Sequence, residues 1–245
     1  MTNKLFLIPK PNPAATLRVF CFPYAGGAPS IFMSWVDQLP AHVELVAVQL
    51  PGRGSRLMEP AHASMSAIID ELNIYQPFFS QKPCVFFGHS LGSRIAFEFA
   101  KNLHIKNRAL PLKIIASASR APHLKSNKKP FYHLPDADFI AQLKSLNGTP
   151  KEILESSELM ALFLPLLRAD FEIADCYQAA VHTLPVPIDI LYGLDDIDIT
   201  PEQIDAWQTL SAHPITKSPF NGDHFFINAL SSEVCCKVNE LITAL

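Results

Sequence analysis

The fold of this chain is decided by one stretch, Val85-Phe86-Phe87-Gly88-His89-Ser90-Leu91-Gly92-Ser93-Arg94. Its first part is a short apolar run that favours a buried strand, and its last part continues into helical spacing. Between them stands a G-x-S-x-G motif, in which two glycines allow the tight strand-to-helix turn that exposes the oxygen of Ser90. The same motif also fits an ordinary helix N-terminus, with Ser90 in the first turn. Residues elsewhere in the chain must decide between the two.

Composition excludes several classes of protein. The chain has 245 residues, of which 49% are hydrophobic, and this suits one α/β domain with a sizeable core. A formal net charge of −3 with scattered signs gives no basic footprint for nucleic acid. No run of about 18 apolar residues occurs, and residues 1–9 lack the apolar segment of a signal peptide. We therefore expect neither a nucleic-acid partner nor a membrane partner.

The cysteine pattern indicates a reducing compartment. The chain has five cysteines without C-x-x-C spacing, namely Cys21, Cys84, Cys176, Cys235 and Cys236. This odd, widely spaced set favours reduced and mostly buried thiols over a disulfide framework or a zinc site, so we expect a cytoplasmic protein. We find neither a phosphate-binding glycine motif nor a metal-spaced set of His and Glu, and we expect no cofactor and no metal.

Apolar runs and helical stripes alternate along the first half of the chain. Runs typical of strands occur at residues 5–8, 18–22, 44–48, 85–87 and 112–116. Helical segments are predicted between them, at residues 29–35, 65–75 and 91–103. This order predicts an α/β fold with a doubly wound, mostly parallel sheet and helices on both of its faces.

The pattern changes at residue 122, and no convincing strand occurs before residue 182. An all-helical insertion between two strands fits a lid over a site at the carboxyl edge of the sheet. It also fits a helical subdomain that only covers the core, and the pattern does not separate the two. We predict a single domain over residues 1–245 with this helical insertion at about 122–182.

Local signals divide the insertion into helical segments. Asn147-Gly148 stops a first apolar stripe. A capping box at residues 149–152, with Pro150 at the first helical position, starts the next segment. A further stripe at residues 159–167 is interrupted by Pro165.

Strand character returns after the insertion. Strands are predicted at residues 188–192 and 215–218. The helix between them starts at a second capping box, at residues 200–203. An amphipathic helix over residues 234–245 closes the chain.

The residues that a serine nucleophile needs follow strands. A serine hydroxyl requires a histidine to take its proton and a carboxylate to hold the tautomer of that histidine. Asp195 and Asp196 come directly after the strand at 188–192, and His224 comes after the last strand. Parallel strands end at one edge of a sheet, so these residues are expected near Ser90. The order Ser, acid, His is that of an α/β-hydrolase fold, and Asp195 and Asp196 compete for the role of acid.

Backbone N–H groups are expected to form the oxyanion hole. One donor is the N–H of Leu91, directly after the nucleophile. The other is the N–H of Tyr24 or of Ala25, in the loop after the strand at 18–22, where two following glycines let the backbone approach a ligand. His89 lies inside the turn, so we expect it to support the turn rather than to take part in catalysis.

The chain resembles the type II thioesterases that work beside polyketide synthases and non-ribosomal peptide synthetases. The resemblance extends over nearly the whole chain and rests on many short motifs. These are residues 21–27, 48–53, 87–92, 120–123, 134–136, 148–150, 167–171 and 193–196, together with Trp207 and His224-Phe225. Two positions differ from the family pattern: Tyr24 stands where histidine is usual, and Asp223 stands where glycine usually precedes His224. Asp223 therefore adds a charge beside the expected base.

The resemblance implies a function and assigns the catalytic residues. It assigns Ser90 as nucleophile, His224 as base and Asp196, three positions after Gly193, as the acid. It implies cleavage of acyl thioesters from the phosphopantetheine arm of acyl or peptidyl carrier domains, through an acyl-enzyme, in order to clear stalled or wrongly loaded chains. Release of products or intermediates and hydrolysis of small esters are the alternatives, and a carrier-binding protein with a relic triad is a non-enzymatic one. We expect a monomer.

A local basic cluster precedes the first helical stripe of the insertion. It consists of His123, Lys125, Lys128, Lys129 and His133. Such a cluster could meet an acidic carrier domain. A solvated loop explains it equally well.

Overall fold

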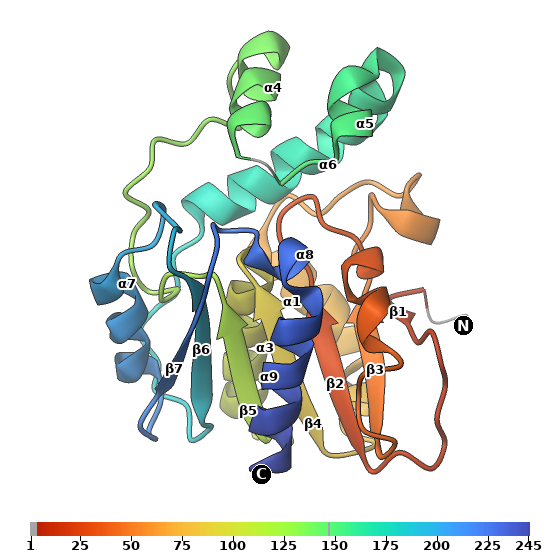
Figure 1. The fold of residues 1–245 in the computed structure, drawn as a ribbon, viewed down its shortest axis with the longest axis vertical. Helices are drawn as coiled ribbons and strands as arrows, with labels where there is room; N and C mark the ends of the chain where they lie inside the picture. The colour runs from red at the N-terminus through yellow and green to blue at the C-terminus, as the bar shows by residue number, and fades with distance from the viewer. Residues whose placement is uncertain (1–3, 147) are drawn as a thin grey trace.

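The computed structural model describes residues 4–146 and 148–245, and within them seven strands form one sheet (Figure 1). The strands lie in the order β1-β3-β2-β4-β5-β6-β7. Their bounds are β1 (Phe6–Leu7), β2 (Leu17–Phe22), β3 (Val43–Val48), β4 (Cys84–His89), β5 (Lys113–Ser117), β6 (Ile188–Gly193) and β7 (Thr216–Phe220). β1 pairs antiparallel with β3 at one edge, and all other pairs are parallel. The predicted mostly parallel α/β sheet is confirmed.

The helices cover both faces of this sheet. The helical elements are η1 (Pro29–Trp35), η2 (Gly54–Arg56), α1 (Met65–Ile74), α2 (Gln76–Phe79), α3 (Leu91–Ile105), α4 (Asp136–Ser145), α5 (Lys151–Glu155), α6 (Ser157–Cys176), α7 (Pro201–Asp205), η3 (Ala206–Leu210), α8 (Phe226–Ala229) and α9 (Ser231–Thr243). Alternate strand residues point to opposite faces. Phe20 and Phe86 pack with α1 and α3, whereas Val19 and Val85 pack with η1 and α9. α9 crosses the front of the sheet in Figure 1.

The central strands are buried on both faces, as their apolar runs predict. Every residue of β2, β3 and β4 is buried. The last strand, β7, lies at the open edge, and its residues are exposed or half-buried. The carboxyl ends of the buried strands therefore form a rigid platform for the loops that follow them.

The insertion predicted at about 122–182 contains α4, α5 and α6, which lie together at one end of the sheet (Figure 1). They have a small core of their own, formed by Phe139, Leu143, Met160 and Leu167. Phe171 and Ala174 of the insertion line one cavity with Ser90 and His224, so the insertion covers the edge at which the strands end.

Two predictions within the insertion are wrong. The capping box at 149–152 does not form: α5 begins after Pro150, whose ψ of 140° is extended, and no side chain caps it. The side-chain cap lies at Ser156 instead, which accepts from the N–H of Leu159 at the start of α6. Pro165 does not interrupt the following stripe but lies inside the continuous helix α6, because packing on both sides of it outweighs the lost backbone hydrogen bond. Asn147, predicted to stop the first stripe, lies outside the described residues.

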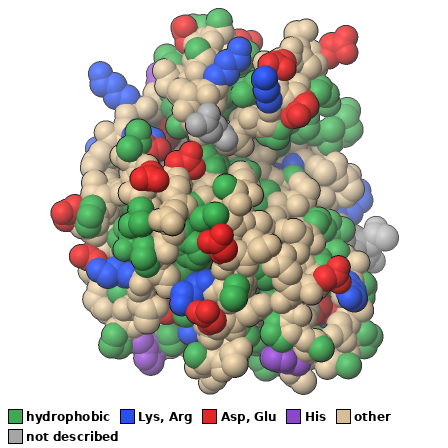
Figure 2. All heavy atoms as spheres, viewed as in Figure 1, with side chains coloured by type: hydrophobic (Ala, Val, Ile, Leu, Met, Phe, Trp, Pro, Cys, Tyr) green, Lys and Arg blue, Asp and Glu red, His purple; other side chains and the backbone are tan. Residues whose placement is uncertain are grey.

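Four further features can be compared with the expectations from the sequence. The second capping box forms at Thr200 and Gln203. Cys21, Cys84 and Cys235 are buried, and Cys176 and Cys236 are exposed. On the face that Figure 2 shows, charged side chains of both signs are scattered without a continuous basic area. None of the helices in the described ranges has the length and apolar content that a membrane span needs.

Candidate active site

Ser90, His224 and Asp196 form a continuous hydrogen-bonded chain. The Nε2 atom of His224 lies 2.9 Å from Oγ of Ser90, and its Nδ1 atom lies 2.7 Å from Oδ2 of Asp196. The carboxylate can only accept, so Nδ1 carries the hydrogen and Nε2 is free to accept the hydroxyl proton of Ser90. Ser90 follows β4, Asp196 follows β6 and His224 follows β7, and Ser90 and His224 are 134 positions apart in the sequence. Parallel strand ends thus bring them to one place, as the sequence predicts.

The backbone around Ser90 is a strained turn that only glycine neighbours permit. Ser90 has a φ of 54° in the left-handed region, between β4 and α3. A Cβ atom on Gly92 would lie 2.0 Å from the carbonyl oxygen of Phe22, and one on Gly88 would lie 2.4 Å from the backbone of Gly92. The helix therefore packs directly against the strand end, and this close approach holds the turn.

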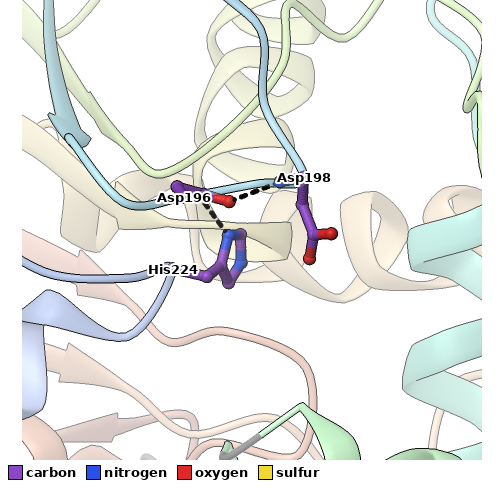
Figure 3. Close-up of side chains that lie close together, drawn as sticks. All are labelled: Asp196, Asp198 and His224. Atoms are coloured by element: carbon purple, nitrogen blue, oxygen red, sulfur yellow. Dashed lines mark hydrogen bonds and ion pairs between the residues drawn. The ribbon is translucent and has the colours of Figure 1, made fainter.

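The structure brings Asp196, and not Asp195, against His224 (Figure 3). Its side chain is only 3% exposed, and its other oxygen accepts from the N–H of Asp198 at 2.9 Å. Burial alone would raise the pKa of Asp196, but the hydrogen bonds, that from His224 first, bring the pKa below its usual value. Asp195 is exposed.

Asp198 lies beside Asp196 and His224 in Figure 3, and the three side chains are of types that can bind a metal ion. Ligand atoms of Asp196, Asp198 and His224 all lie within 4.8 Å of one another. However, Nδ1 of His224 already donates to Asp196, and Lys128 forms an ion pair with Asp198. These partners fit a hydrogen-bonded network better than a metal site, because a ligating nitrogen must be free of hydrogen.

The expected oxyanion donors lie at the same site. Tyr24 and Ala25, just after β2, line one cavity together with Ser90 and His224. Among the hydrogen bonds of residues 4–146 and 148–245, none uses the N–H of Leu91, Tyr24 or Ala25 as donor. These three N–H groups therefore have no partner among the described residues.

Arg53 and Asp170 hold the loop that contains Tyr24 and Ala25, and sequence reasoning did not single them out as site residues. Asp170 on α6 accepts from the N–H of Gly26 at 2.6 Å. Arg53, after β3, donates to Asp170 through two nitrogens at 2.9 Å and to the carbonyl of Gly27 at 3.1 Å. A signal was present, since Asp170 interrupts an apolar helix face and a buried carboxylate needs a partner.

His89 supports the histidine loop rather than only the turn in which it lies. It is fully buried, and its Nε2 lies 2.9 Å from the backbone carbonyl of His224. A carbonyl only accepts, so Nε2 donates, and Nδ1 accepts from the hydroxyl of Ser117 at 2.9 Å. Burial, assisted by the nearby His224, lowers the pKa of His89 to about 3. His89 is therefore neutral and fixes the backbone of the residue that bonds Ser90.

The two departures from the family pattern have local partners. The hydroxyl of Tyr24 pairs with the side-chain amide of Asn228, at 3.2 Å from its nitrogen. Asp223 accepts from the N–H of Phe225 at 2.8 Å and so closes the turn around His224.

In the basic cluster of residues 123–133, Lys128 forms an ion pair with Asp198, so its positive charge is not free to meet a partner.

Known proteins are similar to this chain in sequence and in architecture. A family model described as a thioesterase domain matches residues 17–242. The gramicidin S biosynthesis protein GrsT of Aneurinibacillus migulanus is 35% identical over 247 residues, which cover 99% of this chain and 96% of that protein. Thioesterase PikA5 of Streptomyces venezuelae is 31% identical, over 94% of this chain and 82% of that protein. The solved structure of YbtT, a type II thioesterase from the yersiniabactin NRPS/PKS biosynthetic pathway, gives a TM-score of 0.82 at 32% identity and covers 96% of each chain.

Proposed function

The chain belongs to the thioesterase family, and we propose from this premise that it removes acyl groups from the phosphopantetheine arm of carrier domains in a peptide or polyketide synthase. The observation that carries the proposal is the chain of contacts from Ser90 through His224 to Asp196, at 2.9 and 2.7 Å. In this proposal Ser90 is the nucleophile, His224 is the base, and Asp196 holds the tautomer and orientation of His224.

The reaction takes two steps. Ser90 Oγ attacks the thioester carbonyl while its proton moves to Nε2 of His224. The tetrahedral intermediate then collapses, the C–S bond breaks, and the pantetheine thiolate takes that proton, leaving an acyl ester on Ser90. In the second step His224 removes a proton from water, which attacks the ester, and the proton returns to Ser90 as the free acid leaves.

The oxyanion of each intermediate would be held by the N–H of Leu91 and that of Tyr24 or Ala25. One such donor stabilises the transition state by about 3 to 4 kcal/mol. A thiolate leaves more readily than an amine, so this triad and oxyanion hole are sufficient without a cofactor. The ion pair of Arg53 and Asp170 anchors the loop that contains Tyr24 and Ala25, because Asp170 also accepts from the N–H of Gly26.

The biological role that we propose is editing. GrsT is named for gramicidin S biosynthesis and YbtT for an NRPS/PKS biosynthetic pathway. In this proposal the carrier domains of such a synthase supply the substrate. Removal of stalled or wrongly loaded acyl groups frees the carrier thiol for the next loading. The partners are therefore acyl or peptidyl carrier domains that present their pantetheine arm under the lid formed by α4, α5 and α6.

Hydrolysis of matched substrates tests this proposal. One acyl group is supplied as a carrier-bound thioester, as a pantetheine thioester and as a small oxygen ester. We expect the highest kcat/KM for the carrier-bound thioester, and a loss of about 10³-fold or more in Ser90→Ala. Ser80→Ala, at an exposed position, is the matched control. A higher kcat/KM for the oxygen ester would favour a small-ester hydrolase instead.

A further inference from the structure

The cavity beside Ser90 has a wall of apolar side chains, and its lining also includes charged side chains. Its volume is about 120 Å³, which is enough for several water molecules or a short acyl chain. Phe131, Phe171, Leu146 and Phe225 contribute apolar surface. Such a wall suits the methylene groups of an acyl chain.

Arg94 and Arg120 line the same cavity, and each has one buried donor without a partner among residues 4–146 and 148–245. Arg94 lies on α3, four residues after Ser90, and is 5% exposed. One of its terminal nitrogens donates to the carbonyl of Ala174, but its Nε is buried and has no partner in the described part of the chain. Arg120, after β5, donates through Nε to the carbonyl of Leu124 at 3.2 Å, and its buried Nη2 likewise has no partner among the described residues.

The charges that line the cavity do not cancel. Lys128 and Asp198 form an ion pair with each other. Asp175 on α6 is then the carboxylate left to oppose Arg94 and Arg120, and its buried Oδ2 has no hydrogen-bond partner among the described residues. Burial and the neighbouring Arg120 lower the pKa of Arg94 to about 9, so the guanidinium stays charged at neutral pH. With all three groups ionised, Arg94, Arg120 and Asp175 together carry one net positive charge.

We propose that this cavity binds acyl chains that carry a carboxylate, with the apolar wall against the methylene groups and Arg94 and Arg120 on the acid. This inference rests on the proposed thioesterase function and names its substrate class. A carboxylate provides the planar pair of acceptors that guanidinium groups bind best, and it balances the buried charge. A methyl-ended chain leaves both donors unsatisfied and desolvated, which is unfavourable.

Matched thioesters without a phosphate test the inference. Succinyl- and glutaryl-pantetheine are compared with butyryl- and valeryl-pantetheine, and the measured quantity is the ratio of kcat/KM for acid-ended over methyl-ended chains. We expect a ratio of about 10 or more in the wild type, because the site rejects a chain that leaves its polar groups unpaired. Arg94→Met and Arg120→Met should each reduce the ratio about tenfold, and Asp175→Asn should raise it. Arg108→Met, at an exposed position, should keep it.

Several outcomes would overturn the inference. A wild-type ratio of one or less, unaltered by Arg94→Met, Arg120→Met and Asp175→Asn, excludes a carboxylate subsite. Arg120 is only partly buried, so Arg120→Met keeps the test open if Arg94→Met does not fold. The phosphate of phosphopantetheine is a second anion that the arginines could bind, and the same acyl groups on phosphopantetheine test this. If the arginine variants lose activity only with these phosphorylated substrates, and equally for acid-ended and methyl-ended chains, the arginines bind the phosphate and the inference is wrong. Absence of turnover with every thioester would instead overturn the proposed function, and this inference with it.

Discussion

The side chains of Arg53 and Asp170 form a bidentate ion pair with two N–O distances of 2.9 Å, and they are 3% and 2% exposed. Asp170 belongs to α6 and Arg53 to the loop after β3, so the pair ties the insertion to the sheet. The same carboxylate accepts from the N–H of Gly26, two residues after Tyr24. The lid, the sheet and the loop of the expected oxyanion donors are therefore held by one buried charge pair.

Asp170→Asn should reduce both stability and turnover. The substitution leaves the guanidinium of Arg53 buried without a counter-charge, and breaking such a pair lowers the free energy of unfolding by about 3 to 5 kcal/mol. We expect kcat to fall more than KM rises, because the donor loop loses its anchor. Urea unfolding and steady-state kinetics measure the two effects.

A double variant provides the control for this prediction. Replacing both partners, as Arg53→Met with Asp170→Leu, removes the uncompensated charge and should recover much of the stability, though not the activity. Wild-type stability and kcat in Asp170→Asn alone would show that the ion pair has neither role.

The loops around the triad could be predicted from the sequence because a nucleophile elbow and parallel strand ends impose strong local rules. Gly88 and Gly92 mark the elbow, and the acid and His224 follow strands that end at the same edge. The residues alone leave Asp195 and Asp196 in competition, and the resemblance assigns Asp196, three positions after Gly193. In the structure it is Asp196 that contacts His224, at 2.7 Å.

Contacts between distant segments could not be predicted. Arg53 and Asp170 are 117 positions apart, and no local pattern pairs them. Arg94 lies in an otherwise ordinary helix, and only the fold turns it toward the cavity. Pro165 shows the opposite case: its local signal predicts an interrupted helix, but tertiary packing overrides that signal in α6.

Asp196→Asn and Asp195→Asn should behave differently. In Asp196→Asn the amide can donate to Nδ1 of His224 and so favours the tautomer that cannot accept from Ser90, and kcat should fall about 10³- to 10⁴-fold. Asp195 is exposed, and Asp195→Asn is a matched control at the adjacent position. The single-turnover rate with a carrier-bound thioester measures both, and equal losses in the two variants would refute the assignment of the acid.

His89 should make the protein less stable as the pH falls. Its pKa is about 3 in the folded protein and about 6.5 in the unfolded chain, so the unfolded chain binds the extra proton between these values. The stabilisation is complete above about pH 6.5 and is lost as the pH falls toward about 3, with a slope of about 1.4 kcal/mol per pH unit. Urea midpoints measured from about pH 6.5 to about pH 4 give this slope.

His89→Gln should reduce the slope of the free energy of unfolding against pH by about 1.4 kcal/mol per pH unit, which corresponds to one proton. It should also lower kcat, because the donor to the backbone carbonyl of His224 is displaced. His213→Gln, at an exposed position, is the control. A wild-type slope in His89→Gln would show that His89 does not titrate in this way.

The nature of the covalent intermediate tests the central claim most directly. A slowly hydrolysed acyl-pantetheine is mixed with the enzyme, the reaction is stopped in acid within the first turnovers, and the peptides are analysed by mass spectrometry. We predict that one acyl group is attached to Ser90, and that the adduct accumulates in a variant with impaired deacylation and is absent from Ser90→Ala. An acyl group on any other residue, or full turnover in Ser90→Ala, would contradict the account.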